Sequence, residues 1–202
     1  MGNMPISLLS RGPADTQALA GGIAQMVEGG DLVLLSGELG AGKTAFSQGF
    51  GAGLGVEQRI TSPTFILVQS YNGRIPMHHV DAYRLDSIEE AVDLGMSELL
   101  DSPGVTVVEW GERIRSTLPA DLLDIRIEYG DELNDRLFEL TPIGTRWMAR
   151  LGRLEALAAS IPITDIGPTT DPVPGPTPST DGSLPDGDLF DSRSSSESSE
   201  PC

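Results

Sequence analysis

The most constraining feature of the sequence is the segment Gly37-Glu38-Leu39-Gly40-Ala41-Gly42-Lys43-Thr44, which matches the pattern G-x-x-x-x-G-K-[ST] at every fixed position. It follows a short apolar run, residues 31–36, that is typical of a buried strand, and it leads into a predicted helix. Glycines let backbone N–H groups turn inward around a phosphate at the start of such a helix. This segment, called the phosphate loop below, therefore predicts an α/β fold that binds a phosphorylated ligand.

Lys43 is the only lysine in a chain of 202 residues, and the other twelve basic residues are arginines. Lysine acts on phosphate as a compact point charge, whereas arginine is a wide planar fork that would crowd a tight loop. The lysine at this one position therefore indicates direct contact with phosphate. The hydroxyl of Thr44 is placed to reach a bound Mg²⁺. A glycine-rich turn that matches the pattern by chance is the alternative.

The chain is strongly acidic, with a formal net charge of −17. Residues 163–202 hold eight acidic residues and one arginine, so the remainder of the chain is acidic as well. Proteins that grip DNA or RNA directly carry a basic patch, which this sequence lacks. We therefore expect any role in RNA metabolism to run through a partner that holds the RNA.

The composition changes after Ile161. Residues 163–202 contain seven prolines and a single aromatic residue, Phe190. Such a stretch cannot bury enough apolar surface to offset the entropy cost of ordering it. We predict a P-loop domain over residues 1–162 and a disordered acidic tail over residues 163–202, with a docking or phosphorylation segment as the alternative for the tail.

The single cysteine, Cys202, allows no disulfide within the chain, as is usual in a reducing cytoplasm. No apolar run approaches the length of a transmembrane helix, and the N-terminus lacks the pattern of a signal peptide. These features predict a cytoplasmic protein that does not engage a membrane.

Apolar spacing and turn residues predict the remaining elements. The predicted helices are Pro13–Glu28, Lys43–Leu54, a helix opened by the capping box Ser87–Glu90 and running to Leu94, Met96–Leu100 and Gly144–Ala159. The predicted strands are Ile6–Leu9, residues 31–36, Thr64–Tyr71, Ile75–Val80, Val105–Val108, Leu122–Tyr129 and Arg136–Leu140. Asn72-Gly73 is a hairpin turn signal and implies one antiparallel pair. Together they predict a three-layer α/β fold of the P-loop NTPase type on a mixed, partly antiparallel sheet, with the nucleotide at the carboxyl ends of the parallel strands.

Glu109 directly follows the apolar run Val105–Val108. An acid at the end of a buried strand is the usual second half of a phosphate-loop site, where it holds Mg²⁺ directly or through water. Many strands end in an acid, so this prediction depends on the presence of the phosphate loop. Trp110 comes next, and two interpretations are open, packing in the core or covering the site.

His79, Asp81 and Tyr83 lie two residues apart at the end of a predicted strand, and in an extended segment residues two apart share a face. We expect the three side chains to project together, with Asp81 positioning water or a Mg²⁺-bound water. For His79 and Tyr83 a hydrogen-bonded structural cluster is an equal alternative. Hydroxyls of Thr61–Thr64 could reach the γ-phosphate, as switch segments do, or belong to an ordinary Ser-Pro turn.

Taken in order, four segments of this sequence resemble the TsaE (YjeE) family of small bacterial P-loop ATPases over about residues 5–150. They are Gly37–Thr44 followed by Phe46, Ser62-Pro63-Thr64-Phe65, His79-x-Asp81-x-Tyr83-Arg84-Leu85 and Glu109-Trp110. The phosphate loop is generic, whereas the last two segments together are specific. The resemblance implies a role in making N6-threonylcarbamoyladenosine at position 37 of tRNAs that read codons beginning with A. In that system TsaD, paired with TsaB, performs the chemistry on tRNA. The TsaE member binds between or beside them, meets tRNA only through them, and hydrolyses ATP to reset the complex.

The resemblance also implies roles for individual residues. Binding of ATP is implied for Glu38, Leu39, Gly40, Ala41, Gly42, Lys43, Thr44, Trp110 and Arg136, and binding of Mg²⁺ for Thr44 and Glu109. Catalytic roles are implied for Lys43, Asp81, Glu109 and the switch-like Thr64. Arg136 is the nearest candidate for an arginine that family members often carry near the strand of Tyr129, although the residues before it match no clear family pattern.

Two other functions fit the phosphate loop. A small-molecule kinase of this fold would add a lid with arginines, and the chain has no arginine-rich insertion, since Arg113 and Arg115 lie on a predicted helix. A nucleotide-dependent switch would keep Lys43 and Thr44 but would not need Asp81.

Overall fold

The computed structural model describes residues 4–63, 67–85 and 95–161. Three predicted features fall outside these ranges: Thr64 with the start of its strand, the helix from Ser87 to Leu94, and the tail 163–202. Within the described part of the chain, no helix is long and apolar enough to cross a membrane.

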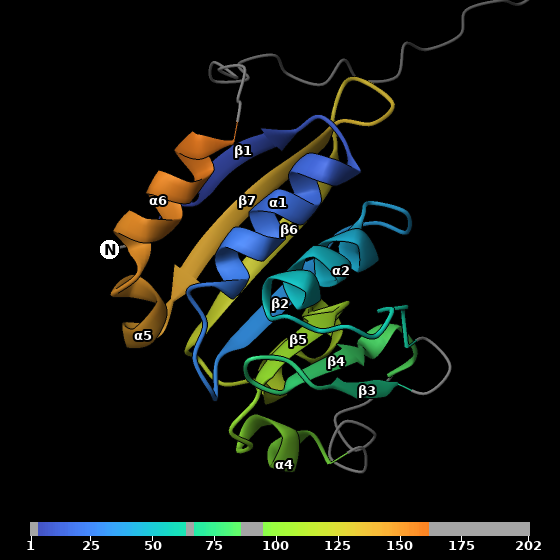
Figure 1. Ribbon diagram of the computed structural model, residues 1–202, viewed down its shortest axis with the longest axis vertical. Coiled ribbons are helices and arrows are strands. Elements are labelled where there is room, and N and C mark those ends of the chain that lie inside the picture. Colours follow the sequence, from blue (N-terminus) through green and yellow to red (C-terminus); the bar gives the residue numbers. More distant parts are fainter. Residues whose placement is uncertain (1–3, 64–66, 86–94, 162–202) are drawn as a thin grey trace, which may run out of the picture. The chain divides into compact units, whose positions relative to one another are not determined.

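The fold is built on a seven-stranded mixed sheet (Figure 1). Its strands are β1 (Ile6–Ser10), β2 (Leu32–Ser36), β3 (Val68–Tyr71), β4 (Met77–Asp81), β5 (Val105–Glu109), β6 (Leu122–Tyr129) and β7 (Arg136–Ile143). They lie in the order β1-β7-β6-β2-β5-β4-β3. β2 runs parallel to β5 and β6, and β4 runs parallel to β5, whereas β1, β3 and β7 add antiparallel pairs. The predicted α/β fold with a mixed, partly antiparallel sheet is confirmed.

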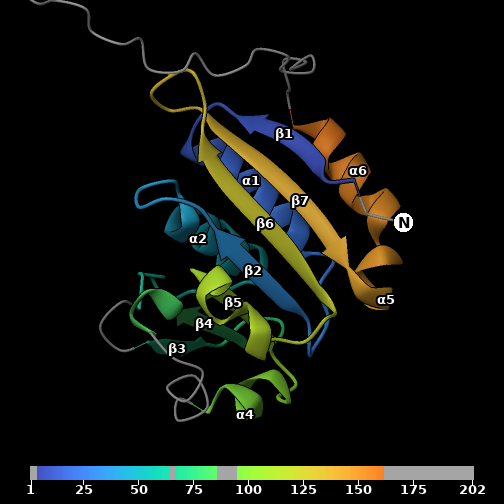
Figure 2. The same cartoon turned by 180° about the vertical axis from the view of Figure 1, so that it is seen from behind.

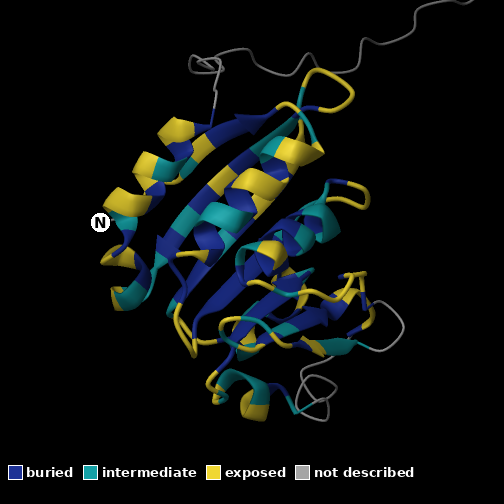
Figure 3. Ribbon diagram, viewed as in Figure 1, coloured by how far each residue is buried: buried dark blue, intermediate teal, exposed yellow. Residues whose placement is uncertain are grey.

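Helices cover the two faces of the sheet unequally. The helices are α1 (Pro13–Ala24), α2 (Lys43–Gly53), α4 (Met96–Leu100), α5 (Gly144–Met148) and α6 (Leu151–Ser160), with the 3₁₀ helices η1 (Ala82–Arg84) and η2 (Gly111–Thr117). α1 and α2 cross one face and α6 lies beside α1, with apolar side chains inward and exposed residues outward (Figures 1 and 3). On the other face, seen in Figure 2, α4 and η2 cover the part of the sheet around β2, β4 and β5. Among the described residues this second helical layer is therefore thin, and Arg126 and Glu128 on β6 are exposed.

Helix α1 ends at Ala24, four residues before the predicted end at Glu28. The guanidinium of Arg74 donates a hydrogen bond to the Ala24 carbonyl at 2.8 Å. The N–H of Glu28, which would continue the helix by donating to that carbonyl, donates instead to Oδ2 of Asp31 at 2.7 Å. The side chains of Arg74, distant in sequence, and of Asp31, just beyond the helix, therefore end α1 earlier than its local pattern predicts.

Helices α1 and α2 approach each other closely through glycines. A Cβ atom on Gly49 would lie 2.4 Å from the Cα atom of Gln17, and one on Gly53 would lie 2.7 Å from the carbonyl oxygen of Gly21. Real Cβ atoms do not approach backbone so closely, so these positions of α2 exclude any other residue unless the helices separate. The helix that carries the phosphate loop is thereby fixed against its neighbour.

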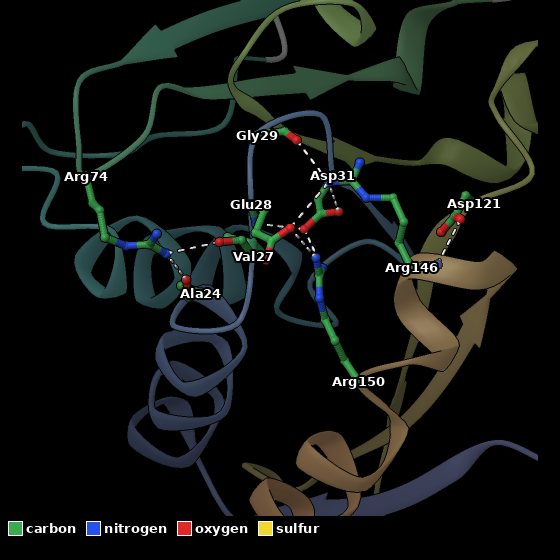
Figure 4. Close-up of polar contacts among 9 residues, drawn as sticks. All are labelled: Ala24, Val27, Glu28, Gly29, Asp31, Arg74, Asp121, Arg146 and Arg150. Carbon is green, nitrogen blue, oxygen red and sulfur yellow. Dashed lines mark hydrogen bonds and ion pairs between the residues drawn. The ribbon is translucent and has the colours of Figure 1, made fainter.

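The prediction of a single helix over Gly144–Ala159 was wrong, because α5 and α6 are separated by a turn at Ala149 and Arg150. The turn directs the side chain of Arg150 toward Asp31, and the Arg150 guanidinium lies 2.5 Å from Oδ2 of Asp31 (Figure 4). Arg146 lies 3.2 Å from Oδ1 of Asp31, and Glu28 lies 3.2 Å from Arg150. We call Glu28, Asp31, Arg146 and Arg150 the Asp31 cluster. It ties the C-terminal helices to the residue that precedes β2.

Candidate functional site

Three parallel neighbouring strands place their carboxyl ends at one edge of the sheet. β2 ends at Ser36, β4 at Asp81 and β5 at Glu109, and the register pairs Glu109 with both Leu35 and Asp81. A cavity of about 420 Å³ opens at this edge beside the phosphate loop. It is lined by Leu39, Gly40, Gly42, Lys43, Thr44, Ala45, Ser62, Asp81, Tyr83, Glu109 and Trp110. The crevice outside the carboxyl ends of parallel strands is where ligands bind in open α/β sheets.

The phosphate loop depends on glycine at its two ends. Gly37 has a φ of +136°, and a Cβ atom there would lie 2.2 Å from the carbonyl oxygen of Ile127. Gly42 has a φ of +110° and is the N-cap of α2. Such backbone conformations are open to glycine and strained for other residues. The glycine spacing read from the sequence is therefore required by the geometry of the loop.

Two side chains from β6 and β7 support the loop from outside. The Tyr129 hydroxyl donates to the Leu39 carbonyl at 2.7 Å, and the guanidinium of Arg136 donates to the Ala41 carbonyl at 3.0 Å. Arg136 also lies over the Tyr129 ring, at 4.5 Å from its centroid. Both groups donate to loop carbonyls and neither lines the cavity, so they hold the peptide units of the loop without occupying the space for a ligand.

Lys43 reaches back across the loop from the first turn of α2. Its Nζ donates to the carbonyls of Gly37 at 2.7 Å and Glu38 at 2.9 Å, and it lies 3.6 Å from the ring centroid of Trp110. Burial of the ammonium lowers the pKa of Lys43 below its ordinary value, while Glu109, Glu112 and Asp81 oppose that shift. A buried cation with main-chain carbonyls as its hydrogen-bond partners is a favourable place for an anion.

Trp110 follows β5 with a φ of +60°, which is uncommon for a residue other than glycine. Its backbone N–H donates to the Leu35 carbonyl at 2.9 Å, which holds this conformation at the edge of the sheet. The ring lines the cavity and lies 5.0 Å from the ring of Tyr83. Of the two interpretations of Trp110, the structure shows the position at the site.

Glu109 is buried, with 2% of its surface exposed. Its Oε1 atom lies 2.7 Å from Nε2 of His79 and 3.0 Å from the hydroxyl of Ser47. Its Oε2 atom accepts a hydrogen bond from the Thr44 hydroxyl at 3.3 Å. The carboxylate at the end of β5 and the hydroxyl at the end of the phosphate loop are therefore in contact.

Asp81 faces the same cavity from β4. Its Oδ2 atom accepts from the Ser62 hydroxyl at 2.8 Å, and its Oδ1 atom accepts from the backbone N–H of Tyr83 at 3.0 Å. That second bond caps η1, so the chain is no longer extended after Asp81. The expectation that His79, Asp81 and Tyr83 share one face of an extended segment is therefore wrong for Tyr83, which lines the cavity from the 3₁₀ helix.

The structure separates the predicted site residues into three groups. Those that line the cavity are Leu39, Gly40, Gly42, Lys43, Thr44, Asp81, Glu109 and Trp110. Glu38 and Ala41 belong to the loop and Arg136 contacts it, but none of the three lines the cavity. Thr64 lies outside the described residues. Ser47 was missed by the sequence analysis, although its position four residues after Lys43 places it on the same face of α2.

Thr44 and Glu109 fit a magnesium ion by their chemistry. Mg²⁺ prefers oxygen ligands and is usually bound by one or two protein groups together with phosphates and water. Within the described residues, no group of three or more His, Cys, Asp or Glu side chains is arranged to hold a metal ion alone. A hydroxyl and a carboxylate oxygen in contact at the cavity wall match the shared kind of magnesium site.

A family model for the "Threonylcarbamoyl adenosine biosynthesis protein TsaE" matches residues 10–137. The chain belongs to the TsaE family. A family member from Bacillus subtilis is 39% identical over 136 residues, which cover 67% of this chain and 84% of that protein. A member from Streptomyces coelicolor is 45% identical over 132 residues, which cover 62% of this chain and 88% of that protein. Both are named tRNA threonylcarbamoyladenosine biosynthesis protein TsaE.

The fold of the family also matches. The crystal structure of Bacillus subtilis YdiB superposes on this chain with a TM-score of 0.68 at 31% sequence identity, covering 77% of this chain and 97% of that structure. The family model spans the phosphate loop, Asp81 and Glu109, so the whole cavity described above lies inside the family's matched region.

Proposed function

We propose that this chain is a Mg²⁺-dependent ATP hydrolase that acts in the formation of threonylcarbamoyladenosine on tRNA. The observation that carries the proposal is the meeting of Lys43, Thr44, Asp81 and Glu109 at one cavity beside the phosphate loop. The names of the family's members supply the pathway.

The phosphate loop and Lys43 would bind the β- and γ-phosphates of ATP. Loop N–H groups at the start of α2 attract anions, and Lys43 adds a full charge. A phosphate beside the ammonium would also offset the burial that lowers the pKa of Lys43. Adenine as the base is inherited from the family, because the chain has no Asn-Lys-x-Asp segment of the kind that reads guanine.

Thr44 and Glu109 would hold Mg²⁺. The ion held by these two residues would supply positive charge against the charge that develops on the phosphates. Asp81 lies across the register from Glu109 and lines the same cavity, so it is placed to orient the attacking water. Ser62 and the Tyr83 N–H hold the Asp81 carboxylate in that direction.

The partners would be TsaD and TsaB, with tRNA held by them. The formal net charge of −17 disfavours direct contact with tRNA by this chain, because phosphate backbones are bound by basic surfaces. A role in tRNA modification would be performed in the cytoplasm. Thr64, for which we propose a switch role near the γ-phosphate, is adjacent in sequence to the Ser62–Pro63 segment at the cavity.

The test is ATP hydrolysis by the purified chain, alone and with the TsaB and TsaD proteins of its host, beside Lys43→Ala and Asp81→Asn. We expect stimulation by the partners, loss of nucleotide binding in the lysine variant, and retained binding with about 10²-fold slower hydrolysis in the aspartate variant. Equal hydrolysis by Asp81→Asn and the native chain would remove the role assigned to Asp81. Transfer of phosphate to a small acceptor without partner stimulation would replace the proposal with a kinase.

A further inference from the structure

One oxygen of Glu109 is occupied from the side opposite the cavity. Its Oε1 atom lies 2.7 Å from Nε2 of His79 and 3.0 Å from the Ser47 hydroxyl, and both of these residues are fully buried. The Ser47 hydroxyl has one hydrogen and also lies 3.1 Å from the Lys43 carbonyl, so it cannot donate to both acceptors at once. His79 is therefore the donor that is always available to Oε1 of Glu109.

The direction of the His79 bond follows from what surrounds the ring. An ionised carboxylate only accepts, so Nε2 must carry the hydrogen. Nδ1 is buried, and no partner for it exists among the described residues. A buried N–H without an acceptor is costly, so the ring is assigned the tautomer with its hydrogen on Nε2 and a bare Nδ1. This tautomer makes His79 a fixed donor to Glu109.

The arrangement leaves Glu109 with one oxygen for the site. Oε2 points to the Thr44 hydroxyl at 3.3 Å on the cavity side, whereas Oε1 is held by His79 within the core. We propose that His79 is a positioning residue that fixes Glu109 so that Oε2 alone is presented to the magnesium ion of a bound nucleotide. The inference rests on the proposed function and assigns the buried histidine a role in it.

A purely structural role would have a different signature. His79 and Asp81 lie on the same side of β4, so the strand places the donor to Oε1 and the cavity-facing carboxylate two residues apart. A packing role would be served by any side chain of suitable volume and would affect only stability. Partners of metal ligands, in contrast, typically change metal affinity by about 10- to 100-fold when they are removed.

The experiment compares three variants of the full chain, His79→Gln, His79→Asn and His79→Leu. Gln places an N–H donor where Nε2 stands, and Asn places one where Nδ1 stands, so they are a matched pair of similar polarity. ATP affinity is measured by calorimetry in excess EDTA and in excess Mg²⁺. We expect the gain in affinity from Mg²⁺ to fall about tenfold or more in His79→Asn and His79→Leu and to be largely kept in His79→Gln, with affinities in EDTA unchanged.

The outcomes separate the two proposals. If the native chain does not bind ATP with Mg²⁺, the proposed function is wrong, and the inference about His79 is wrong with it. If the native chain binds and the folded Asn and Gln variants keep the full Mg²⁺ gain, the inference alone is overturned. Thermal unfolding of each variant identifies any that do not fold.

The tautomer of His79 can also be measured in the native chain, so this test does not depend on whether the His79 variants fold. The chain has two histidines, so side-chain ¹⁵N spectra contain two imidazole rings, and His78→Gln identifies the signals of His79. We expect His79 to carry its hydrogen on Nε2. A hydrogen on Nδ1 of the neutral ring would break the contact with Glu109 and overturn the inference.

Discussion

Strand β2 has charged residues at each of its ends, and the two groups are built in opposite ways. Before the strand, the Asp31 cluster pairs two acids with two arginines at distances of 2.5 to 3.9 Å, and Asp31 is 2% exposed (Figure 4). After the strand, Lys43 faces the surrounding acids Asp81, Glu109 and Glu112, but its hydrogen bonds go to loop carbonyls.

The difference separates structural charge from functional charge. In the Asp31 cluster each charge has a partner inside the protein, so the cluster is complete and holds elements together. At the phosphate loop the pKa of Lys43 is lowered by burial, and its charge is not matched by a carboxylate at bonding distance within the described residues. An anion from solution would complete that group. Four predictions test this contrast, from the largest expected effect to the smallest.

Arg150→Met should have the largest effect on stability. It removes the nearest cation of the buried Asp31 and leaves Arg146 at 3.2 Å as its remaining partner, so the loss should approach the cost of a fully broken buried pair, about 3–5 kcal/mol. Chemical denaturation measures the loss, and ATP affinity should stay within about twofold of the native value, because the two groups lie at opposite ends of β2. Arg146→Met, at a side chain that is 40% exposed, is the matched control and should cost less. A loss below about 1 kcal/mol for Arg150→Met would contradict the structural role of the cluster.

Lys43→Ala should show the reverse pattern. We expect ATP affinity to fall about 100-fold, or about 2.7 kcal/mol, because the charge that meets the phosphates is removed. The unfolding temperature without nucleotide should be unchanged or raised, since the variant removes an ammonium that burial disfavours. A stability loss as large as that of Arg150→Met would erase the distinction between the two groups.

The pH dependence of ATP binding should report the same lysine. Burial lowers the pKa of Lys43 in the nucleotide-free chain, and bound phosphate raises it again. Affinity is therefore full below the lowered pKa and falls as the pH rises through it, by up to about tenfold per pH unit. Calorimetry at alkaline pH, in buffers with different heats of ionisation, should detect a proton taken up on binding. The uptake should be absent in Lys43→Ala, and a native chain without uptake would place the pKa of Lys43 at its ordinary value.

Arg126→Gln should have the smallest effect. Arg126 lies 2.6 Å from Glu128, but the two side chains are 60% and 47% exposed. Exposed pairs contribute less than about 1 kcal/mol, so the free energy of unfolding should barely change. When both variants are measured in the same denaturation experiment, the difference between their losses in free energy of unfolding shows how much of the loss in Arg150→Met comes from burial. A cost similar to that of Arg150→Met would mean that burial is not the cause.

The sequence predicted what depends on local spacing. The phosphate loop, Lys43 and Thr44 lie within eight consecutive residues, so their pattern contains nearly all of their geometry. Glu109 was found because an apolar run ends at it. The mixed sheet followed from the hairpin signal at Asn72-Gly73 in an otherwise α/β order.

What the sequence did not predict depends on contacts between distant residues. The bond from His79 to Glu109 requires β4 to lie beside β5, and the break between α5 and α6 serves an ion pair between Arg150 and Asp31. The strand β7 runs to Ile143 and not to Leu140, because β6 pairs with it as far as Ile143. Beyond Leu140 the other side of β7 is not paired with β1, and a strand that is open on one side tolerates Pro142.

The chain has two tryptophans, and one lies beside each of the two charged groups at the ends of β2. Trp147 is fully buried with the guanidinium of Arg150 5.1 Å from its ring, and Trp110 lines the cavity with Nζ of Lys43 3.6 Å from its ring. Each ring is therefore an optical reporter of one cation. In Trp110→Phe the remaining emission should follow the integrity of the fold, and in Trp147→Phe it should follow the arrival of phosphate at the loop, so intrinsic fluorescence can read the two groups separately without a label.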